Sequence, residues 1–320
     1  MKILSTSFKF ACLFQILLVG AAWAQNFPDK PVKFVVPTPA GVAPDIVGRQ
    51  LALRLEKSLG TPVVIDNKPG ASGIIGTDAV AKAPADGHTL LYGYNQLMAI
   101  NPLLFSKLPY QSSDFVPITL VARAGYLILV NPNSKIHTIQ DLIAAAKAKP
   151  GAITYGSQGL GTVNHLIMEL LSRQASVDMV HVPFSSGMAQ NLMGGQIDVA
   201  VEPNGSGVGY AQSGKLRAIA VTSSERIKSL PQVPTVGETL PGYVVEGWHA
   251  IWAPKGTPKP IRDRLNKEIV DVIKSADFTS KILELGLIAA GTSQEGLDTA
   301  LVEDRQKWES IVKEKKIKLD

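Results

Sequence analysis

The sequence predicts an α/β protein built from two lobes, each with its own mainly parallel sheet. Two observations carry this prediction: strands and helices alternate along the first hundred residues, and a second strand–helix series starts near residue 138. Strands that alternate with helices of about 10 to 15 residues form parallel sheets through right-handed crossovers. The length of 320 residues also favours two domains over one.

The first 24 residues have the pattern of a secretory signal peptide. A positive start precedes an apolar run over residues 10–20, and Ala22–Trp23–Ala24 supplies small residues for cleavage. The run is shorter than the ~18 residues that a membrane-spanning helix needs. We therefore expect cleavage after Ala24 and a periplasmic mature protein. The sole cysteine, Cys12, lies in this segment, which predicts a mature chain without a disulfide.

The basic run near residue 315 and the spacing of the histidines argue against some classes of function. The formal charge of the whole chain is +5, and a basic run at 313–318 lacks the interleaved aromatic residues typical of nucleic-acid binding. The five histidines form no pair at metal-ligand spacing. We therefore expect no nucleic-acid partner, no metal and no cofactor.

Two strand–helix series set the expected domain organisation. In the first, strands at 32–36, 63–66 and 89–94 alternate with helices at 45–59 and 74–82. In the second, a β-type run at 118–130 precedes strands at 153–156, 179–183, 197–201 and 216–222, with helices opening at Thr138 and covering 162–174 and 186–193. A strand at 244–253 and sixty mostly helical residues follow.

The chain passes between the two series near 118–126 and again near 222–250. We therefore expect two lobes joined by a two-crossing hinge. The first lobe is predicted to comprise residues 25–122 and 228–320, and the second lobe residues 123–227.

The loop after the first strand is predicted to aim a helix N-terminus at the space above the sheet. The strand runs into the turn residues 37–42, and Asp45 lies in the first turn of the following helix. The first N–H groups of a helix have no intrahelical partner and together carry about half a positive charge. We therefore expect this loop to bind an anion.

The segment from Gly156 to Thr162 repeats this arrangement in the second series. Thr162 fits the N-cap position, but its hydroxyl and that of Ser157 could also bind an oxyanion. Ligands of open α/β sheets bind beyond the carboxyl ends of the strands, so two facing lobes would enclose an anion between two helix N-termini. His165, one turn into this helix, either faces the ligand or braces the loop.

Two further segments are predicted to approach the cleft. The glycines at 70, 73 and 76 lack the spacing of a nucleotide loop, and we expect a third helix to start beside the ligand there, near Ser72. Glu202 ends a strand and is either a solvated strand end or an acceptor for a ligand hydroxyl, amine or protonated carboxyl.

The sequence lacks the motifs of a serine hydrolase active site. There is no G-x-S-x-G motif, and no serine has an identifiable base. We therefore expect a binding protein and not an enzyme. The alternatives are an exported enzyme that uses His165 with Glu202 or Asp45 as acid and base on a carboxylated substrate, and a receptor that signals to a sensor partner.

Short motifs in order along the whole mature chain resemble one protein family. They are FPDKPV (27–32), VPTPAG (36–41) with Asp45, DNKPGA (66–71), AINP (99–102), YGS (155–157) with Gly159, Gly161 and His165, VHVPF (180–184), GQID (195–198), GKLRA (214–218), PTV (234–236) and APKGTP (253–258). These motifs resemble the periplasmic substrate receptors of tripartite tricarboxylate transporters, the Bug or TctC-like family.

The resemblance implies a type II periplasmic-binding-protein fold that closes on a small organic carboxylate. Its two strand-to-helix loops would grip the carboxylate, partly through bridging waters, and the receptor would deliver a di- or tricarboxylate, an amino acid or an aromatic acid to membrane transporter subunits. We expect a monomer. The predicted ligand-binding residues are Thr38, Pro39, Ala40, Gly41, Val42, Asp45, Ser72, Ser157, Gly159, Gly161, Thr162, His165, Phe184 and Glu202.

The first loop departs from the family pattern. Thr38 stands where the family often has phenylalanine, Val42 where a second glycine is usual, and Pro44 where threonine or serine is more typical. Glu202–Pro203 replaces a common Asp–Asn pair. We expect the grip on the carboxylate to persist and the far end of the pocket to be atypical.

Overall fold

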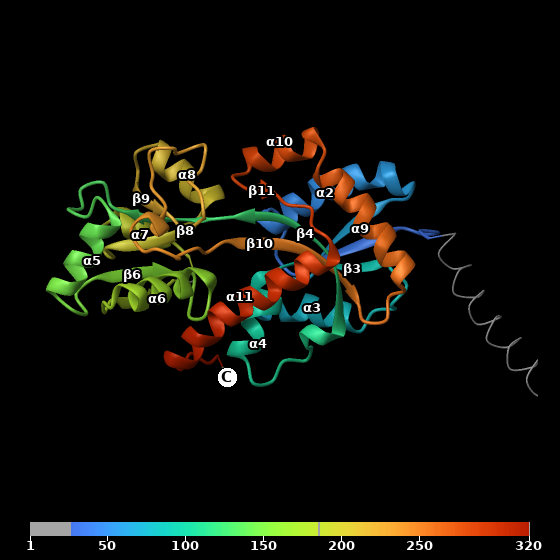
Figure 1. Cartoon of the computed structure of the whole chain (residues 1–320), viewed down its shortest axis with the longest axis horizontal. Helices are drawn as coiled ribbons and strands as arrows, with labels where there is room; N and C mark the ends of the chain where they lie inside the picture. Colours follow the sequence, from blue (N-terminus) through green and yellow to red (C-terminus); the bar gives the residue numbers. More distant parts are fainter. Residues whose placement is uncertain (1–26, 185, 320) are drawn as a thin grey trace, which may run out of the picture.

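A computed structural model describes residues 27–184 and 186–319 and builds them around two separate sheets (Figure 1). The predicted signal peptide and Cys12 lie outside the described residues. The strands of the first sheet are, in spatial order, β11 (Ile288–Ala289), β4 (Phe115–Ala124), β10 (Gly247–Pro254), β3 (Thr89–Tyr94), β1 (Val32–Val36) and β2 (Val63–Asn67). Those of the second are β7 (Val180–Pro183), β6 (Thr154–Ser157), β8 (Val199–Pro203), β5 (Tyr126–Val130) and β9 (Arg217–Val221).

Both sheets are mixed. β1 pairs in parallel with β2 and β3, and β6 pairs in parallel with β7 and β8. The strands next to the lobe crossings, β4, β5 and β10, run antiparallel to their neighbours. The two-lobe α/β fold is thus confirmed, but the sheets are mixed rather than mainly parallel because the chain enters and leaves each lobe along antiparallel strands.

Helices cover both faces of the first sheet. Side chains alternate along β1, so those of Val32, Phe34 and Val36 face one core and that of Val35 faces the opposite core. One core includes side chains of α2 (Ala43–Leu59), α9 (Lys259–Ile273) and α10 (Ala276–Glu284). The opposite core includes side chains of α3 (Ile74–Ala81) and of the start of α11 (Gln294–Glu314).

The second sheet is covered in the same way. Helices α5 (Ile139–Ala148) and α6 (Val163–Ala175) pack on one face, and α7 (Met188–Met193) and α8 (Asn204–Gln212) on the other. The predicted capping box at the start of α5 is confirmed. The amide of Asp141 donates to the Thr138 hydroxyl at 3.1 Å, and the amide of Thr138 donates to the Asp141 carboxylate at 3.0 Å.

The crossings between the lobes lie side by side. The chain leaves the first sheet at Gly125, between β4 and β5, and returns after β9 through the segment that leads to β10. The hydroxyl of Thr222 joins the crossings, because it accepts from the amide of Tyr126 at 2.9 Å and donates to the carbonyl of Val245 at 2.7 Å. A Cβ added at Gly125 would lie 3.0 Å from the side chain of Ser223, so glycine allows these segments to approach.

The last helix reaches from one lobe to the other, as Figure 1 shows. Leu297, near the start of α11, belongs to a core of the first sheet, whereas Trp308 and Ile311 belong to the core that holds α6. Beyond the helix, Lys315 forms an ion pair of 2.8 Å with Glu169 of α6.

The segment between β9 and β10 also contacts the second lobe, through the hydroxyl of Tyr243, which donates to the carbonyl of Ile167 at 2.8 Å. The predicted residue boundaries of the two lobes stay a prediction.

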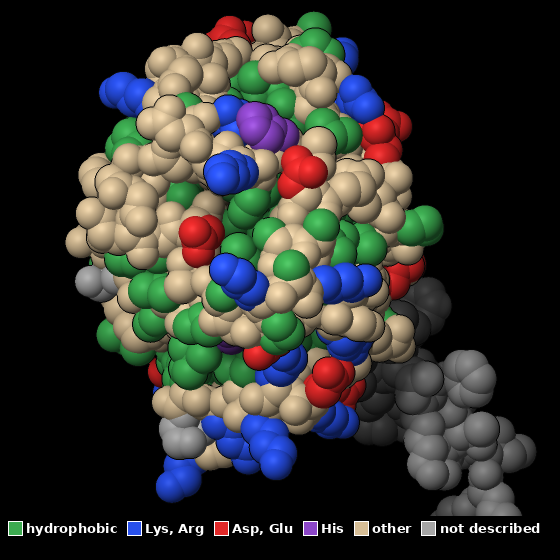
Figure 2. All heavy atoms as spheres, turned by 90° about the vertical axis from the view of Figure 1, so that its left-hand side faces the viewer, with side chains coloured by type: hydrophobic (Ala, Val, Ile, Leu, Met, Phe, Trp, Pro, Cys, Tyr) green, Lys and Arg blue, Asp and Glu red, His purple; other side chains and the backbone are tan. Residues whose placement is uncertain are grey.

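The outer surface carries charges of both signs. Figure 2 shows that lysine and arginine side chains are interspersed with acidic side chains over the end of the molecule that the second lobe forms. Within the described residues, no helix is both long and apolar enough to cross a membrane, and no group of His, Cys, Asp or Glu side chains is arranged to hold a metal ion.

Candidate functional site

A cavity of about 790 Å³ lies between the lobes. The start of α2 and the residues that follow β3 line it from the first lobe, and most of the loop before α6, with the first residues of that helix, lines it from the second. Tyr126 and Trp248, on the strands next to the crossings, also line it. The cavity therefore lies where the sequence predicted a ligand between two strand-to-helix loops.

Two helices begin at this cavity without a side-chain cap. The N-cap residue of α2 is Val42, which has no hydroxyl or carboxylate to offer. The N-cap residue of α6 is Thr162, and its hydroxyl donates to the carbonyl of Gly159 at 2.7 Å instead of capping the helix. Pro44 lies in the first turn of α2, so α6 presents one backbone donor more than α2. Both helix ends are left to interact with a ligand or with water.

The side chain of Asp45 stabilises the first loop through hydrogen bonds. It is buried, and its carboxylate accepts from the amide of Gly41 at 2.8 Å and from the side chain of Asn67 at 3.0 Å. Arg49, one turn further along α2, pairs with the same carboxylate at 2.9 Å. Burial opposes ionisation, but these hydrogen bonds outweigh it and lower the pKa of Asp45 below its usual value. Asp45 therefore braces the loop rather than lining the cavity.

The residues before Val42 approach the cavity without lining it. Pro39, Ala40 and Gly41 are exposed at the surface of the loop. The carbonyl of Thr38 accepts from Asn67 at 3.1 Å, and its hydroxyl oxygen is buried with no hydrogen-bond partner among the described residues. Thr38 thus has a hydroxyl without a hydrogen-bond partner in the described part of the chain, but the residue does not line the cavity.

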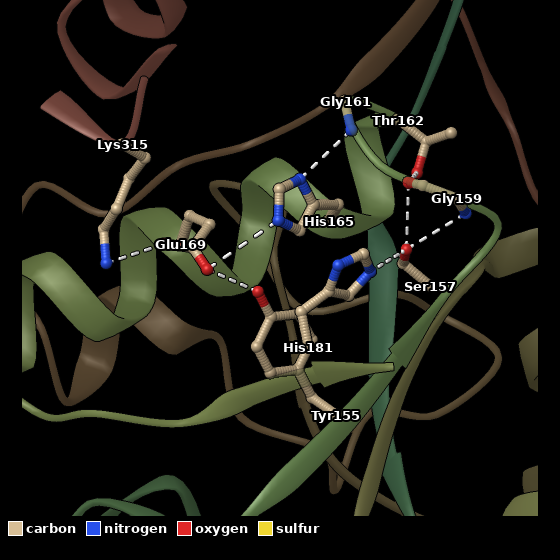
Figure 3. A network of polar contacts seen from close by, with 9 residues as sticks. All are labelled: Tyr155, Ser157, Gly159, Gly161, Thr162, His165, Glu169, His181 and Lys315. Carbon is tan, nitrogen blue, oxygen red and sulfur yellow. Dashed lines mark hydrogen bonds and ion pairs between the residues drawn. The ribbon is translucent and has the colours of Figure 1, made fainter. Parts of the chain in front are cut away.

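The second loop is held by hydrogen bonds to two histidines, which Figure 3 shows. The hydroxyl of Ser157 lies 3.0 Å from the carbonyl and 3.1 Å from the amide of Gly159, and 2.6 Å from Nε2 of His181. The amide of Gly161 donates to Nδ1 of His165 at 3.2 Å. Of the two roles predicted for His165, the structure shows the bracing of the loop.

Behind the histidines lies a buried carboxylate, Glu169. Its Oε1 accepts from the hydroxyl of Tyr155 at 2.5 Å, and its Oε2 forms an ion pair of 2.8 Å with Nζ of Lys315 (Figure 3). Burial opposes ionisation of Glu169, but these two interactions outweigh it and lower its pKa. The rings of His165 and His181 lie 4.1 Å apart. Burial lowers the pKa of both, that of His165 to about 4, so both rings are neutral at pH 7.

Three other predicted residues lie around the cleft. Ser72 lines the cavity from the turn before α3. Glu202 is buried, accepts from the hydroxyl of Ser206 at 2.8 Å, and has a pKa that burial raises. Phe184 packs in the core beneath α7 and α8. Neither Glu202 nor Phe184 lines the cavity, whereas Ser206 does.

The predicted site residues thus form two groups. Val42, Ser72, Gly161 and Thr162 line the cavity. Thr38, Pro39, Ala40, Gly41, Asp45, Ser157, Gly159, His165, Phe184 and Glu202 lie behind or beside its walls. Which of them contact a ligand stays a prediction.

Several cavity residues were not predicted. Tyr94 ends β3 and Gln96 follows it, at the carboxyl end of the strand where the rule for open α/β sheets could have located them. Trp248 and Leu319 come from the returning strand and the C-terminal segment. Leu319 donates its amide to the carbonyl of Leu104 and lies against Gly161, where a Cβ would approach its side chain to 3.4 Å. No local motif marks either residue.

Comparison with known proteins agrees with this architecture. The sequence profile of a family described as "Tripartite tricarboxylate transporter family receptor" matches residues 47–317. The periplasmic binding protein BugD is 31% identical with a TM-score of 0.76, and the match covers 91% of this chain and 99% of that one.

Two solved structures from Rhodopseudomonas palustris are also similar. A protein solved with adipate is 32% identical with a TM-score of 0.79, over 90% of this chain and 97% of its own. MatC, solved with bound malate, is 30% identical with a TM-score of 0.75, over 89% of this chain and all of its own (100%).

Two lobes around a cleft define a solute-binding protein of the periplasmic-binding-protein fold. The chain belongs to the family of tripartite tricarboxylate transporter receptors. This is a family of binding proteins and not of enzymes, and its solved relatives include a periplasmic protein and receptors of carboxylates.

Proposed function

We propose that this protein is exported to the periplasm, binds a small organic carboxylate between its lobes and delivers it to the membrane subunits of a tripartite tricarboxylate-type transporter. One observation carries the proposal: α2 and α6, from opposite lobes, both begin at the same cavity without a side-chain cap. Relatives solved with adipate and malate support a carboxylate as the ligand.

The energetics require more than the two helix ends. Each helix N-terminus contributes about 0.3–1 kcal/mol to anion binding, and up to about 2 kcal/mol where water is excluded. A micromolar affinity needs about 8 kcal/mol. Direct hydrogen bonds from loop amides and from hydroxyl groups such as that of Ser72 must therefore supply most of the affinity.

A thermal-shift screen of mono-, di- and tricarboxylates tests the proposal. A ligand at about 100 times its dissociation constant stabilises the folded state by about 2.7 kcal/mol, which raises the melting temperature by several degrees. If no carboxylate stabilises the protein, the proposed function is wrong.

A matched pair of glycine substitutions locates the site. Gly41 precedes α2 with φ +86° and Gly60 ends the same helix with φ +69°, and a Cβ at either position meets no atom within 4 Å. Both changes to alanine impose a similar backbone strain. We expect Gly41→Ala to weaken carboxylate binding at least several-fold in calorimetry and Gly60→Ala to leave it unchanged. Equal effects on binding would contradict the proposed site.

A further inference from the structure

Charged side chains are almost absent from the walls of the cleft. Among the described residues that line it, none is lysine or arginine, and the one acidic residue is the exposed Glu284 on α10. His249 also lines the cleft, and burial lowers its pKa to about 4, so its ring is neutral at pH 7. Positive potential in the cleft therefore comes from backbone N–H groups.

The two loops instead present large apolar side chains to the cleft. Val42, on the first loop, is 41% exposed, and Leu160, on the second, is 45% exposed. Trp248 and Leu319 add further apolar surface to the same cavity. Apolar side chains left open on both sides of a cavity are the surface that an apolar ligand body would cover.

The charge available to an anion in this cleft matches one carboxylate. Two helix N-termini together supply about one elementary positive charge. A second carboxylate held against Val42, Leu160 or Trp248 would lose water without gaining a cationic partner, which is unfavourable. A tricarboxylate would meet this penalty twice.

We propose that the ligand carries one carboxylate on an apolar body, an alkyl chain or an aromatic ring, and that Val42 and Leu160 select it over di- and tricarboxylates. This inference rests on the proposed function, because it assumes that the carboxylate lies at the two helix N-termini. It assigns ligand selection to the two loop residues that present apolar side chains at these termini.

Calorimetry with paired ligands tests the inference. Hexanoate and adipate have the same chain length and differ by one carboxylate, and we expect hexanoate to bind at least tenfold more tightly. From butyrate to hexanoate, the affinity should rise about two- to fourfold per methylene, given about 0.8 kcal/mol for each fully buried CH₂. Benzoate should likewise bind more tightly than citrate.

The outcomes separate this inference from the proposed function. If adipate or citrate binds as tightly as hexanoate and benzoate, the inference is overturned and the proposed function stands. If none of the four binds, the inference is overturned, and the proposed function fails with it only if no carboxylate of the thermal-shift screen stabilises the protein.

A substitution that adds a cation tests the role of the loop side chain directly. Leu160→Arg places a guanidinium beside the ligand, so adipate should gain affinity and hexanoate should lose it, with a change of at least tenfold in their ratio. Leu53→Arg is the matched control, because Leu53 is 62% exposed on α2 and does not line the cleft. An unchanged ratio in folded Leu160→Arg protein would overturn the assignment of selectivity to Leu160.

Discussion

At the scale of single residues, the neutral ring of His165 determines the shape of the second loop. The amide of Gly161 donates to Nδ1 of His165, so this nitrogen must be unprotonated. A protonated ring would direct N–H at the amide and break the contact. Burial lowers the pKa of His165 to about 4, which keeps the acceptor available at neutral pH.

This arrangement predicts an acid-sensitive fold and site. Between about pH 6.5, the ordinary histidine value, and about pH 4, the unfolded chain binds the proton more readily than the folded one. Stability should therefore fall as the pH falls through this range, whereas carboxylate binding should fall only near pH 4, where the folded protein itself takes up the proton. Urea unfolding at pH 7 and pH 4.5 and calorimetry at pH 7 and pH 4 measure the two effects.

Two substitutions of His165 distinguish the effect of the hydrogen bond to Gly161 from the effect of ring protonation. His165→Asn keeps an acceptor near Nδ1 and cannot be protonated, so it should retain binding and lose less stability in acid than the native protein. His165→Leu removes the acceptor and should weaken binding at both pH values. If His165→Leu binds carboxylates as well as the native protein, the hydrogen bond to Gly161 does not shape the site. Titration of the ligand itself is common to all three proteins and cancels in the comparison.

At the scale of elements, the residue that follows α11 supports the second loop through α6. Lys315 pairs with Glu169, and Glu169 lies behind Tyr155 and the two histidines. Replacing Lys315 by methionine leaves a buried carboxylate with one partner fewer, which should cost about 1–2 kcal/mol of unfolding free energy because Lys315 is partly exposed. Urea denaturation checks this value.

Lys313→Met is the control for this substitution. Lys313 pairs with Glu309 on the same helix, but both side chains are exposed, so the loss should change stability very little. An equal loss of unfolding free energy in the two variants would show that the Lys315–Glu169 contact stabilises the fold no more than an exposed ion pair does.

How much of this structure the sequence predicts depends on whether a feature is encoded by neighbouring residues or by contacts between distant parts of the chain. Local patterns predicted most of the strands and helices and the capping box of Thr138, because each is encoded within a few residues, but α8 was not predicted. The spacing of Trp308 and Ile311 indicates a buried helix face but not its partner, so the packing of α11 against α6 was not foreseen. Trp248 and Leu319 reach the cleft only through tertiary packing, which no local motif encodes.

At the scale of the whole molecule, the closeness of the crossings should control how the lobes close. A Cβ at Gly125 would lie 3.0 Å from the Ser223 side chain and 3.1 Å from its amide nitrogen. Gly125→Ala should therefore separate the two crossings at a cost of about 1–3 kcal/mol, typical of overpacking. We expect a lower ligand affinity and a smaller decrease in radius of gyration on ligand binding, measured by calorimetry and small-angle X-ray scattering.

Gly48→Ala tests whether any buried glycine would give the same result. A Cβ at Gly48, inside α2, would meet Ile65 and Tyr92 at ordinary contact distances of 3.6 and 3.7 Å. This variant should bind and close as the native protein does. If Gly125→Ala also behaves as native, the crossings do not limit closure.

The position of Leu319 bears on how the protein is produced for any of these measurements. Leu319 forms part of the cleft wall, so an affinity tag fused to the C-terminus would emerge beside the ligand. A histidine tag there would bring titratable rings and chelated nickel to a site that is otherwise nearly free of charge. Phe27 packs against His88, and neither lines the cleft. A tag placed before Phe27 would therefore leave the binding surface unaltered.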